Sequence, residues 1–434
     1  MELTAETDWQ EMIGRLKRSG QVKYVEENKR IRLHRVPNDI YYVQQWGLET
    51  IRAEAAWEIA GTATKPVVVA VIDSGIDSTH YDLIDRIDSR GYSFVDDNQD
   101  ISDNDGHGTA VASIIAAQTD NNLGIAGVDG QAPVKILPLK TVDWDGYSYM
   151  SDVIKAINYA IDAGVDVINL SMGSDSYSDI ENDAIQMAIS HGITVVASAG
   201  NEGCSRYDYP ASYPGVISVG AIDREKKRAE FSNYNDRVDV VAPGVKITTC
   251  VPGDGYDCLT GTSFSAPMVT GIAAMLKSLD PTLNAYAIGK IIRETSCDLG
   301  SPGKDNEYGY GVVDMNRAVL QGLPGFITWE THENVAPTRP WSIRFSSLVE
   351  SSSINQNTIF ITDQQGNQLP IKYSIEHEQN ADIVCIKPEQ DYNFGEHYTL
   401  WIRNVVSGDG RTLKNGVKMD FTITESWNKE VPGN

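Results

Sequence analysis

Five short runs within residues 67–219 are almost wholly apolar, and they alternate along the chain with stretches of helical periodicity. The runs are residues 67–72, 134–139, 165–170, 193–197 and 216–219. A strand with apolar side chains on both faces must be buried on both faces, as parallel strands covered by helices are. The pattern therefore predicts an α/β fold built on a doubly wound parallel sheet, in a chain long enough for a further domain.

Polar residues stand where three of these runs end. Asp73 and Ser171 come directly after two of the runs, and Asn201 follows closely after a third. In open sheets of this kind, ligands bind beyond the carboxyl ends of the strands. The sequence therefore predicts a functional site at this edge of the sheet.

The segment GTSFSAPM places Ser263 between a glycine turn and Pro267, at the start of a long apolar helix. We interpret Ser263 as a nucleophile. A serine hydroxyl is too weakly acidic to attack unaided, so it needs a base, a group that orients the base, and donors for the oxyanion. His107 in DGHGT opens another apolar helix, and Asp73 and Asn201 lie at strand ends, so these residues are the candidates for those roles.

Four segments resemble, in order, the signature blocks of the subtilisin-like serine proteases, the subtilase family: VAVIDSGID, DGHGTAVA, VVASAGNEG and GTSFSAPMVTG. The chain order Asp, His, Ser belongs to the subtilisin type of triad. The resemblance covers residues 37–322 and implies a subtilisin-like catalytic domain there. Phe264 and Ser265 stand where the family usually has Met and Ala, but no catalytic side chain is lost. Each residue alone has a structural explanation, such as a helix cap; together, the four blocks predict catalysis.

The resemblance implies a serine endopeptidase that hydrolyses peptide bonds of proteins through an acyl-enzyme, with broad specificity. His107 would be the general base for Ser263, and Asp73 would hold the imidazole. The Asn201 side chain and the Ser263 backbone N–H would bind the oxyanion. A catalytically silent scaffold with a C-terminal binding module is the alternative, and the intact catalytic side chains argue against it.

The resemblance also places substrate binding on segments that sandwich an extended peptide by strand addition. The residues concerned are Gly146, Tyr147, Ser148, Ser171, Met172, Gly173, Ala197, Ser198, Ala199 and Gly200. Residues 197–200 and those after Asn201 would wall the pocket for P1, the substrate residue before the scissile bond. Met172 predicts an apolar, fairly roomy P1 pocket, unless this side chain fills core space instead.

A polar loop at residues 118–125 breaks the helix that starts at His107, and it resembles the family's strong calcium site. By position, the ligands would be the side chains of Asp39, Asp82 and Asn121 with the carbonyl oxygens of Gln118, Leu123 and Ile125. Such an all-oxygen shell suits Ca²⁺. The resemblance implies a structural ion that ties the mature N-terminus to the core; a turn without metal is the alternative.

Residues 1–36 form a charged segment that resembles the second half of a subtilisin-type propeptide, with an amphipathic helix at 9–16 and a strand at 22–26. Such propeptides assist folding and inhibit the enzyme until self-cleavage, so the resemblance implies a zymogen. The following PNDIYY resembles a thermitase-like mature start, which predicts a processing cut shortly before Pro37. An extended N-terminal arm is the alternative.

After residue 322 the pattern changes to short stretches that alternate apolar with polar residues and are separated by turn residues. This pattern predicts a small antiparallel all-β sandwich in residues 323–434. The segment resembles bacterial Ig-like domains. Docking to a cell wall, a polysaccharide or a protein partner is one expected role, and a stabilising appendage is the other.

The charge balance is strongly acidic, with 36 basic against 60 acidic residues and a net charge of −24. This charge repels phosphate backbones and anionic lipid, which argues against nucleic-acid binding. It fits either divalent-cation binding or a solvated acidic surface. No run is long enough to span a bilayer and no signal peptide is present, which taken literally indicates a cytoplasmic protease. A secreted protease whose export signal has been removed would look the same, and secretion is the expectation that we favour.

Five cysteines are too few for a disulfide scaffold. Cys250 and Cys258 flank a turn just before the nucleophile, so a hairpin would bring them into bridging range, and we predict a disulfide between them. Such a bond would favour secretion. Cys204, Cys297 and Cys385 are expected to be small hydrophobic side chains, because no Cys or His lies at zinc spacing from them.

Overall fold

The computed structural model describes residues 36–423, except residues 61–62, 324, 365, 379–380 and 414. The predicted propeptide elements at 9–16 and 22–26 therefore lie outside the described residues. Within the described ranges, no helix is both long enough and apolar enough to cross a membrane.

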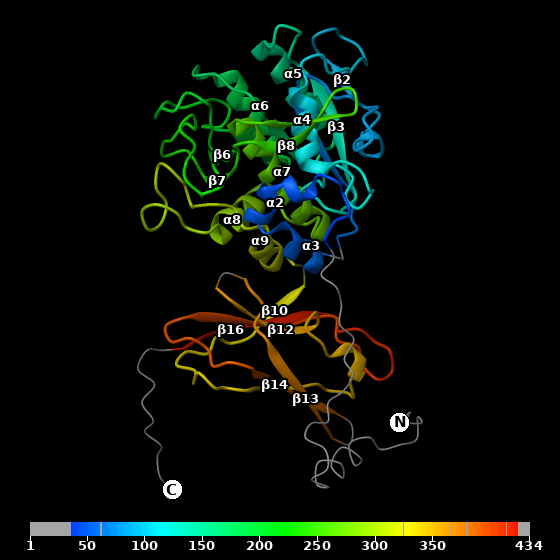
Figure 1. The fold of residues 1–434 in the computed structure, drawn as a ribbon, viewed down its shortest axis with the longest axis vertical. Helices are drawn as coiled ribbons and strands as arrows, with labels where there is room; N and C mark the ends of the chain where they lie inside the picture. Colours follow the sequence, from blue (N-terminus) through cyan, green and yellow to red (C-terminus); the bar gives the residue numbers. More distant parts are fainter. Residues whose placement is uncertain are drawn as a thin grey trace. The chain divides into compact units, whose positions relative to one another are not determined.

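A seven-stranded sheet, built from strands between residues 67 and 243, forms the centre of this part of the chain (Figure 1). Its strands, in spatial order, are β2 (Tyr92–Ser93), β3 (Val134–Lys140), β1 (Val67–Asp73), β4 (Val167–Leu170), β5 (Thr194–Ser198), β6 (Ile217–Ile222) and β7 (Val240–Pro243). Every neighbouring pair is parallel. Each of the five apolar runs overlaps one strand of this sheet, so the predicted α/β fold is confirmed.

The two faces of the sheet bury two separate hydrophobic clusters. In β1, Val69 and Val71 belong to one cluster while Ala70 and Ile72 belong to the other, because successive side chains of a strand point to opposite faces. The first cluster includes α3 (Ala53–Ile59), α4 (His107–Ala116), α7 (Thr262–Leu279), α8 (Ala285–Thr295) and α9 (Met315–Gly322). The second includes α5 (Met150–Ala163) and α6 (Asp179–Ser190). Helices thus cover both faces, as the apolar strands require.

The helix α7 carries Ser263 in its first turn and is buried along nearly its whole length. Pro267 lies inside this helix. Proline has no N–H, so it cannot donate the helical hydrogen bond to the carbonyl four residues earlier. That carbonyl belongs to Ser263, and the helix therefore offers it no backbone donor.

The predicted Cys250–Cys258 disulfide is wrong. Both cysteines are free thiols, on the antiparallel strands β8 (Ile247–Val251) and β9 (Gly255–Leu259). The register pairs Cys250 with Tyr256 and Thr248 with Cys258, so the two cysteines are diagonal neighbours. Diagonal Cβ atoms lie roughly 7 Å apart, beyond the span of a disulfide. The turn is tighter than predicted and shifts the register by two residues.

The C-terminal segment folds into two sheets around its own core, which confirms the predicted sandwich. One sheet contains β10 (Phe326–Thr328), β16 (Gly416–Thr422), β15 (His397–Ile402) and β12 (Ile359–Asp363); the other contains β11 (Trp341–Arg344), β14 (Asp382–Pro388) and β13 (Ile371–His377). All pairs are antiparallel except β10 with β16. Ile343, Ile361, Val384 and Phe421 are among the buried residues between the sheets.

Candidate active site

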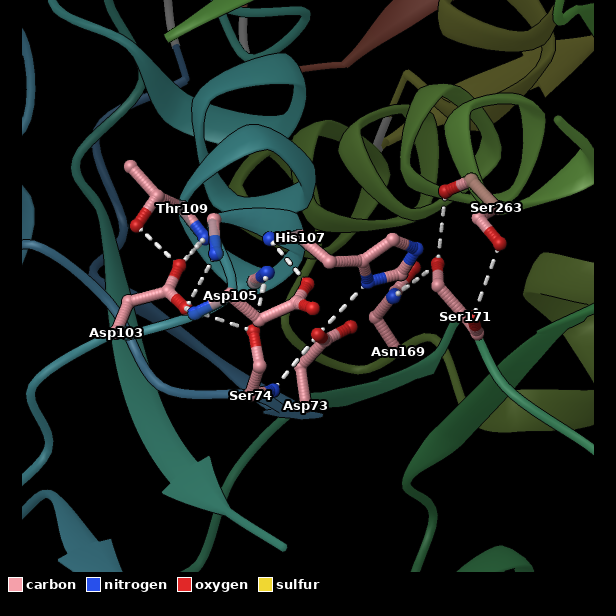
Figure 2. Close-up of polar contacts among 11 residues, drawn as sticks. Asp73, Ser74, Asp103, Asp105, His107, Thr109, Asn169, Ser171 and Ser263 are labelled. Atoms are coloured by element: carbon pink, nitrogen blue, oxygen red, sulfur yellow. Dashed lines mark hydrogen bonds and ion pairs between the residues drawn. The ribbon is translucent and has the colours of Figure 1, made fainter. Parts of the chain in front are cut away.

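Asp73 and His107 are in direct contact, as predicted (Figure 2). Asp73 is the last residue of β1 and is buried, and His107 is the first residue of α4. His107 Nδ1 lies 2.8 Å from Asp73 Oδ1. This hydrogen bond fixes the tautomer in which Nδ1 carries the proton and Nε2 is the free base.

Burial lowers the pKa of His107, but the charge of Asp73 and the hydrogen bond to it raise it more. Asp105 and Asp103 add to the rise, so the pKa of His107 lies above its usual value. The imidazole is therefore a stronger base than free histidine. This is the property required for removing a proton from a serine hydroxyl.

Asp103 holds the start of α4, a role that the sequence reasoning missed. Its Oδ1 accepts from Ser74 Oγ at 2.9 Å, and its Oδ2 accepts from the Thr109 backbone N–H at 2.9 Å (Figure 2). Ser74 Oγ in turn accepts from the Gly108 N–H at 2.9 Å. These bonds tie the end of β1 to the first turn of α4, and so fix Asp73 relative to His107.

Ser263 is held by two reciprocal hydrogen bonds with Ser171. Ser263 Oγ donates to the Ser171 carbonyl at 3.0 Å, and Ser171 Oγ donates to the Ser263 carbonyl at 2.9 Å. The second bond satisfies the carbonyl that Pro267 leaves without a helical donor. Ser171 Oγ is itself positioned by Asn169 Nδ2 at 2.9 Å.

The Ser263 hydroxyl makes no hydrogen bond to His107 in the described part of the chain. The imidazole is nevertheless close, because its ring centroid lies 5.6 Å from that of Phe264, the next residue in α7. Catalytic hydrogen bonds are often long or misaligned before substrate binds. The structure thus brings the predicted triad into one site, with the hydroxyl turned toward Ser171 (Figure 2).

Asn201 is exposed and its amide has a fixed orientation. Its Oδ1 accepts from both the backbone N–H and the hydroxyl of Thr262, each at 2.9 Å. Its Nδ2 donates to none of the described residues, and the Ser263 backbone N–H also lacks an acceptor among them. Two donors therefore remain open beside Ser263 among the described residues. Thr262 was missed by the sequence reasoning, although it stands next to Ser263 in the same motif.

The predicted substrate-binding residues lie on three segments near the strand ends. Residues 171–173 follow β4, residues 197–200 end and follow β5, and residues 146–148 form a loop before α5. Ala197 and Ala199 have buried side chains in hydrophobic clusters, so only their backbone can meet a ligand. Met172 is half-buried and packs against the hydrophobic cluster to which α5 and α6 contribute. Tyr147 is 73% exposed.

The predicted calcium-binding residues also gather in one place. Asp39 and Asp82 are buried, and both contact the loop at residues 118–125. Asp39 accepts from the Asp120 N–H at 3.0 Å, whereas Asp82 accepts from Asn121 Nδ2 at 2.7 Å and from the Ile125 N–H at 2.9 Å. Within the described ranges, no cluster of three or more His, Cys, Asp or Glu side chains suits a metal ion, so any ion there needs carbonyl and amide oxygens.

Comparisons with known proteins agree with this geometry. The subtilase family model matches residues 64–311, and the bacterial Ig-like domain model matches residues 330–423. A thermophilic serine proteinase from Bacillus sp. (strain AK1) is 41% identical over 290 residues, which are 66% of this chain and 71% of that protein. Subtilisin BL from Lederbergia lenta is 39% identical over 273 residues, which are 63% of this chain and 97% of that protein. The halolysin-like extracellular serine protease Nep from Natrialba magadii is 34% identical over 306 residues, which are 69% of this chain and 55% of that protein.

With its Asp73–His107 pair beside Ser263, the chain belongs to the subtilase family of serine endopeptidases.

Proposed function

We propose that Ser263 is the nucleophile of this endopeptidase and that Asp73, His107 and Asn201 act with it. The observation that carries the assignment is the 2.8 Å contact between His107 Nδ1 and Asp73 Oδ1, because it leaves Nε2 free as a base. For the reaction, Ser263 Oγ turns by rotation of its side chain from the Ser171 carbonyl to His107 Nε2.

The reaction then follows from the groups in place. His107 Nε2 takes the proton of Ser263 Oγ as the oxygen attacks the peptide carbonyl carbon. Asn201 Nδ2 and the Ser263 N–H donate to the resulting oxyanion. The imidazolium gives its proton to the leaving amine as the C–N bond breaks. A water molecule, deprotonated by His107, hydrolyses the acyl-enzyme and regenerates Ser263.

We place the peptide substrate between residues 146–148 and residues 171–173, paired with them through backbone hydrogen bonds. Recognition through the backbone makes few demands on sequence, which supports broad specificity away from P1. Residues 197–200 would form the second wall at P1. Met172 offers an apolar contact there, and the expectation of an apolar P1 preference rests on this side chain.

We propose a structural Ca²⁺ held by Asp39, Asp82 and Asn121 with the carbonyl oxygens of residues 118, 123 and 125. Two buried carboxylates face this loop, and neither forms an ion pair with a described residue. Burial raises the pKa of Asp39, and the charge of Asp82 adds to the rise. The three carbonyl oxygens accept no hydrogen bond from the described residues. Hard oxygen donors with uncompensated negative charge are what Ca²⁺ requires.

We propose that residues 1–36 are a pro-segment removed by the enzyme itself, that the catalytic domain spans residues 37–322, and that residues 323–434 form the Ig-like domain and tail. Docking of the Ig-like domain to a cell wall or protein partner, like secretion, remains a prediction. Secretion is supported by the extracellular relative named above. The predicted disulfide no longer supports it, because Cys250 and Cys258 are free thiols.

The test compares the parent with Ser263→Ala. We expect the parent to digest casein, to gain the mass of one fluorophosphonate probe on Ser263, and to lose its N-terminal segment. Ser263→Ala should do none of these, while its circular dichroism spectrum matches that of the parent. A parent that neither cleaves casein nor takes up the probe would be a catalytically silent scaffold, and the proposal would fail.

A further inference from the structure

The carboxylate of Asp208 lies between the two segments proposed to flank the P1 side chain. A Cβ added to Gly173 would lie 1.8 Å from Asp208 Oδ1, and a Cβ added to Gly200 would lie 2.9 Å from Asp208 Oδ2. The carboxylate therefore rests against the bare Cα atoms of both glycines, one after β4 and one after β5. Any larger side chain at Gly173 would displace it.

This carboxylate has no partner in the described part of the chain. The Asp208 main-chain carbonyl accepts from the Ser212 N–H, but no described donor bonds to Oδ1 or Oδ2 and no described cation pairs with them. Arg206, the nearby cation, is instead paired with Asp175 at 3.2 Å. A partly buried charge without a partner is costly, so this position is suited to a ligand that brings the missing cation.

A second carboxylate increases the negative charge at the same place. The Cβ added to Gly200 would also lie 2.9 Å from Glu202 Oε2. Glu202 forms no ion pair with a described residue, and its carboxylate accepts from Asn233 Nδ2 at 2.7 Å. The atoms that pack against Gly200 are thus the Asn233 amide nitrogen, at 2.3 Å from such a Cβ, and the carboxylates of Asp208 and Glu202.

We propose that Asp208 determines the P1 specificity of this protease and selects lysine or arginine at that position. The inference rests on the proposed endopeptidase activity, and it replaces the expectation of an apolar P1 preference with a preference for a cationic P1 side chain. The aliphatic part of a P1 lysine or arginine would run along Met172, and its cationic end would reach Asp208. An apolar P1 side chain would bury the Asp208 carboxylate without a partner, which disfavours it.

The sequence around the proposed processing site is consistent with this preference. Residues 29–35, KRIRLHR, contain four Lys or Arg residues and come directly before Val36-Pro37. A cut shortly before Pro37 would then follow Arg35, with Val36 as the residue after the scissile bond. Asp208 and Arg35 carry opposite charges, as an enzyme and its own cleavage site must if P1 is basic.

The experiment measures kcat/KM for a matched set of peptide nitroanilides that differ only at P1, with Lys, Arg, Phe or Leu. Active enzyme is counted by fluorophosphonate titration, so differences in folding do not enter the comparison. In the parent we expect kcat/KM for the Lys and Arg peptides to exceed that for the Phe peptide by at least about tenfold, because a partly buried charge pair contributes at least this much. Asp208→Asn should lower the Lys/Phe ratio at least about tenfold.

The matched control is Asp183→Asn, which removes the same charge from an exposed residue of α6 and should change the ratio less than about threefold. If Asp208→Asn does not fold, benzamidine supplies the measurement on the parent alone, because this small cation should compete with the Lys peptide. Intact mass of the matured parent should show a cut after Arg35.

The outcomes separate this inference from the proposed function. Faster cleavage of Phe and Leu than of Lys and Arg by the parent would overturn the P1 assignment and leave the endopeptidase intact. An unchanged ratio in Asp208→Asn would likewise overturn it. Failure to cleave any peptide, together with no fluorophosphonate uptake, would refute the proposed function itself.

Discussion

The hydroxyl of Ser171 donates a 2.9 Å hydrogen bond to the carbonyl oxygen of Ser263, the residue proposed as the nucleophile. This bond exists because Pro267, four residues further on, has no N–H to offer that carbonyl. The Ser171 side chain, which follows β4, therefore supplies the hydrogen bond that Pro267 cannot supply within α7. The linkage can be measured.

We predict that Ser171→Ala, in the inactive Ser263→Ala background, lowers the free energy of unfolding by about 1–3 kcal/mol, because it leaves a buried carbonyl without a donor. Pro267→Ala supplies a backbone N–H to the same carbonyl. The double variant should therefore lose less stability than the sum of the single variants. Denaturant unfolding of all four proteins gives the coupling, and strictly additive effects would contradict the linkage.

We predict that Asp73→Asn lowers kcat by about ten thousandfold, because His107 loses the acceptor that fixes its tautomer. The pH profile should change as well. His107 must be neutral to act as a base, so kcat/KM in the parent rises with pH through a pKa above the usual value of histidine. Without the Asp73 charge, the acidic limb should move to lower pH. Asp105→Asn should move it in the same direction by less, since Asp105 contributes less to the shift.

We predict that Asn201→Leu lowers kcat about 100- to 1000-fold and changes KM little, because the lost donor serves the oxyanion only in the transition state. Thr262→Val is the informative companion. It removes the hydroxyl that bonds Asn201 Oδ1 but keeps the Thr262 N–H on the same oxygen. Its kcat should fall less than about tenfold. Equal losses in both variants would argue against Asn201 as the oxyanion donor.

The sequence predicted the parallel sheet from a strong local pattern, whereas the Asp73–His107 contact was implied by the resemblance of four sequence blocks to the subtilase family. Buried strands must be apolar on both faces, and their carboxyl ends must meet at one edge. The position of Ser263 beside these residues was implied by the same resemblance, since Ser263 lies on a helix and not at a strand end. Short strands such as β2 and β7 were missed because two to four residues carry too little periodicity.

Contacts that depend on register or on distant loops could not be predicted in this way. The Cys250–Cys258 disulfide failed because one turn decides which residues of β8 and β9 face each other. Asp103 and Asp208 are ordinary loop residues in the sequence. Their roles become visible only when folding places one against Ser74 and the other against Gly173.

We predict that a calcium chelator lowers the melting temperature of the parent and that added Ca²⁺ restores it. An ion present at about 100 times its Kd stabilises the folded state by roughly 2.7 kcal/mol. Asp82→Asn should melt at the same temperature with and without chelator, because it removes one of the two buried carboxylates. Asp85→Asn, a nearby surface variant, should respond like the parent. An unchanged melting temperature of the parent would rule out the structural ion.

The charge on Asp208 is predicted to change near neutral pH. Burial raises the pKa of Asp208 to about 7, with further increases from Glu202, Asp175 and Glu181 and a decrease from Arg206. Below this pH the empty site holds a neutral carboxylic acid, and above it a carboxylate. A cationic P1 side chain gains only from the charged form, whereas an apolar side chain gains only from the neutral form.

The Lys/Phe ratio of kcat/KM should therefore rise as the pH increases through about 7, the pKa of Asp208 in the free enzyme. The ratio isolates Asp208, because ionisation of His107 affects both peptides equally and cancels. In Asp208→Asn the ratio should stay flat across the same range. A parent ratio that does not change with pH would mean that the P1 side chain does not sense this carboxylate, and a slope that survives in Asp208→Asn would assign the titration to another group.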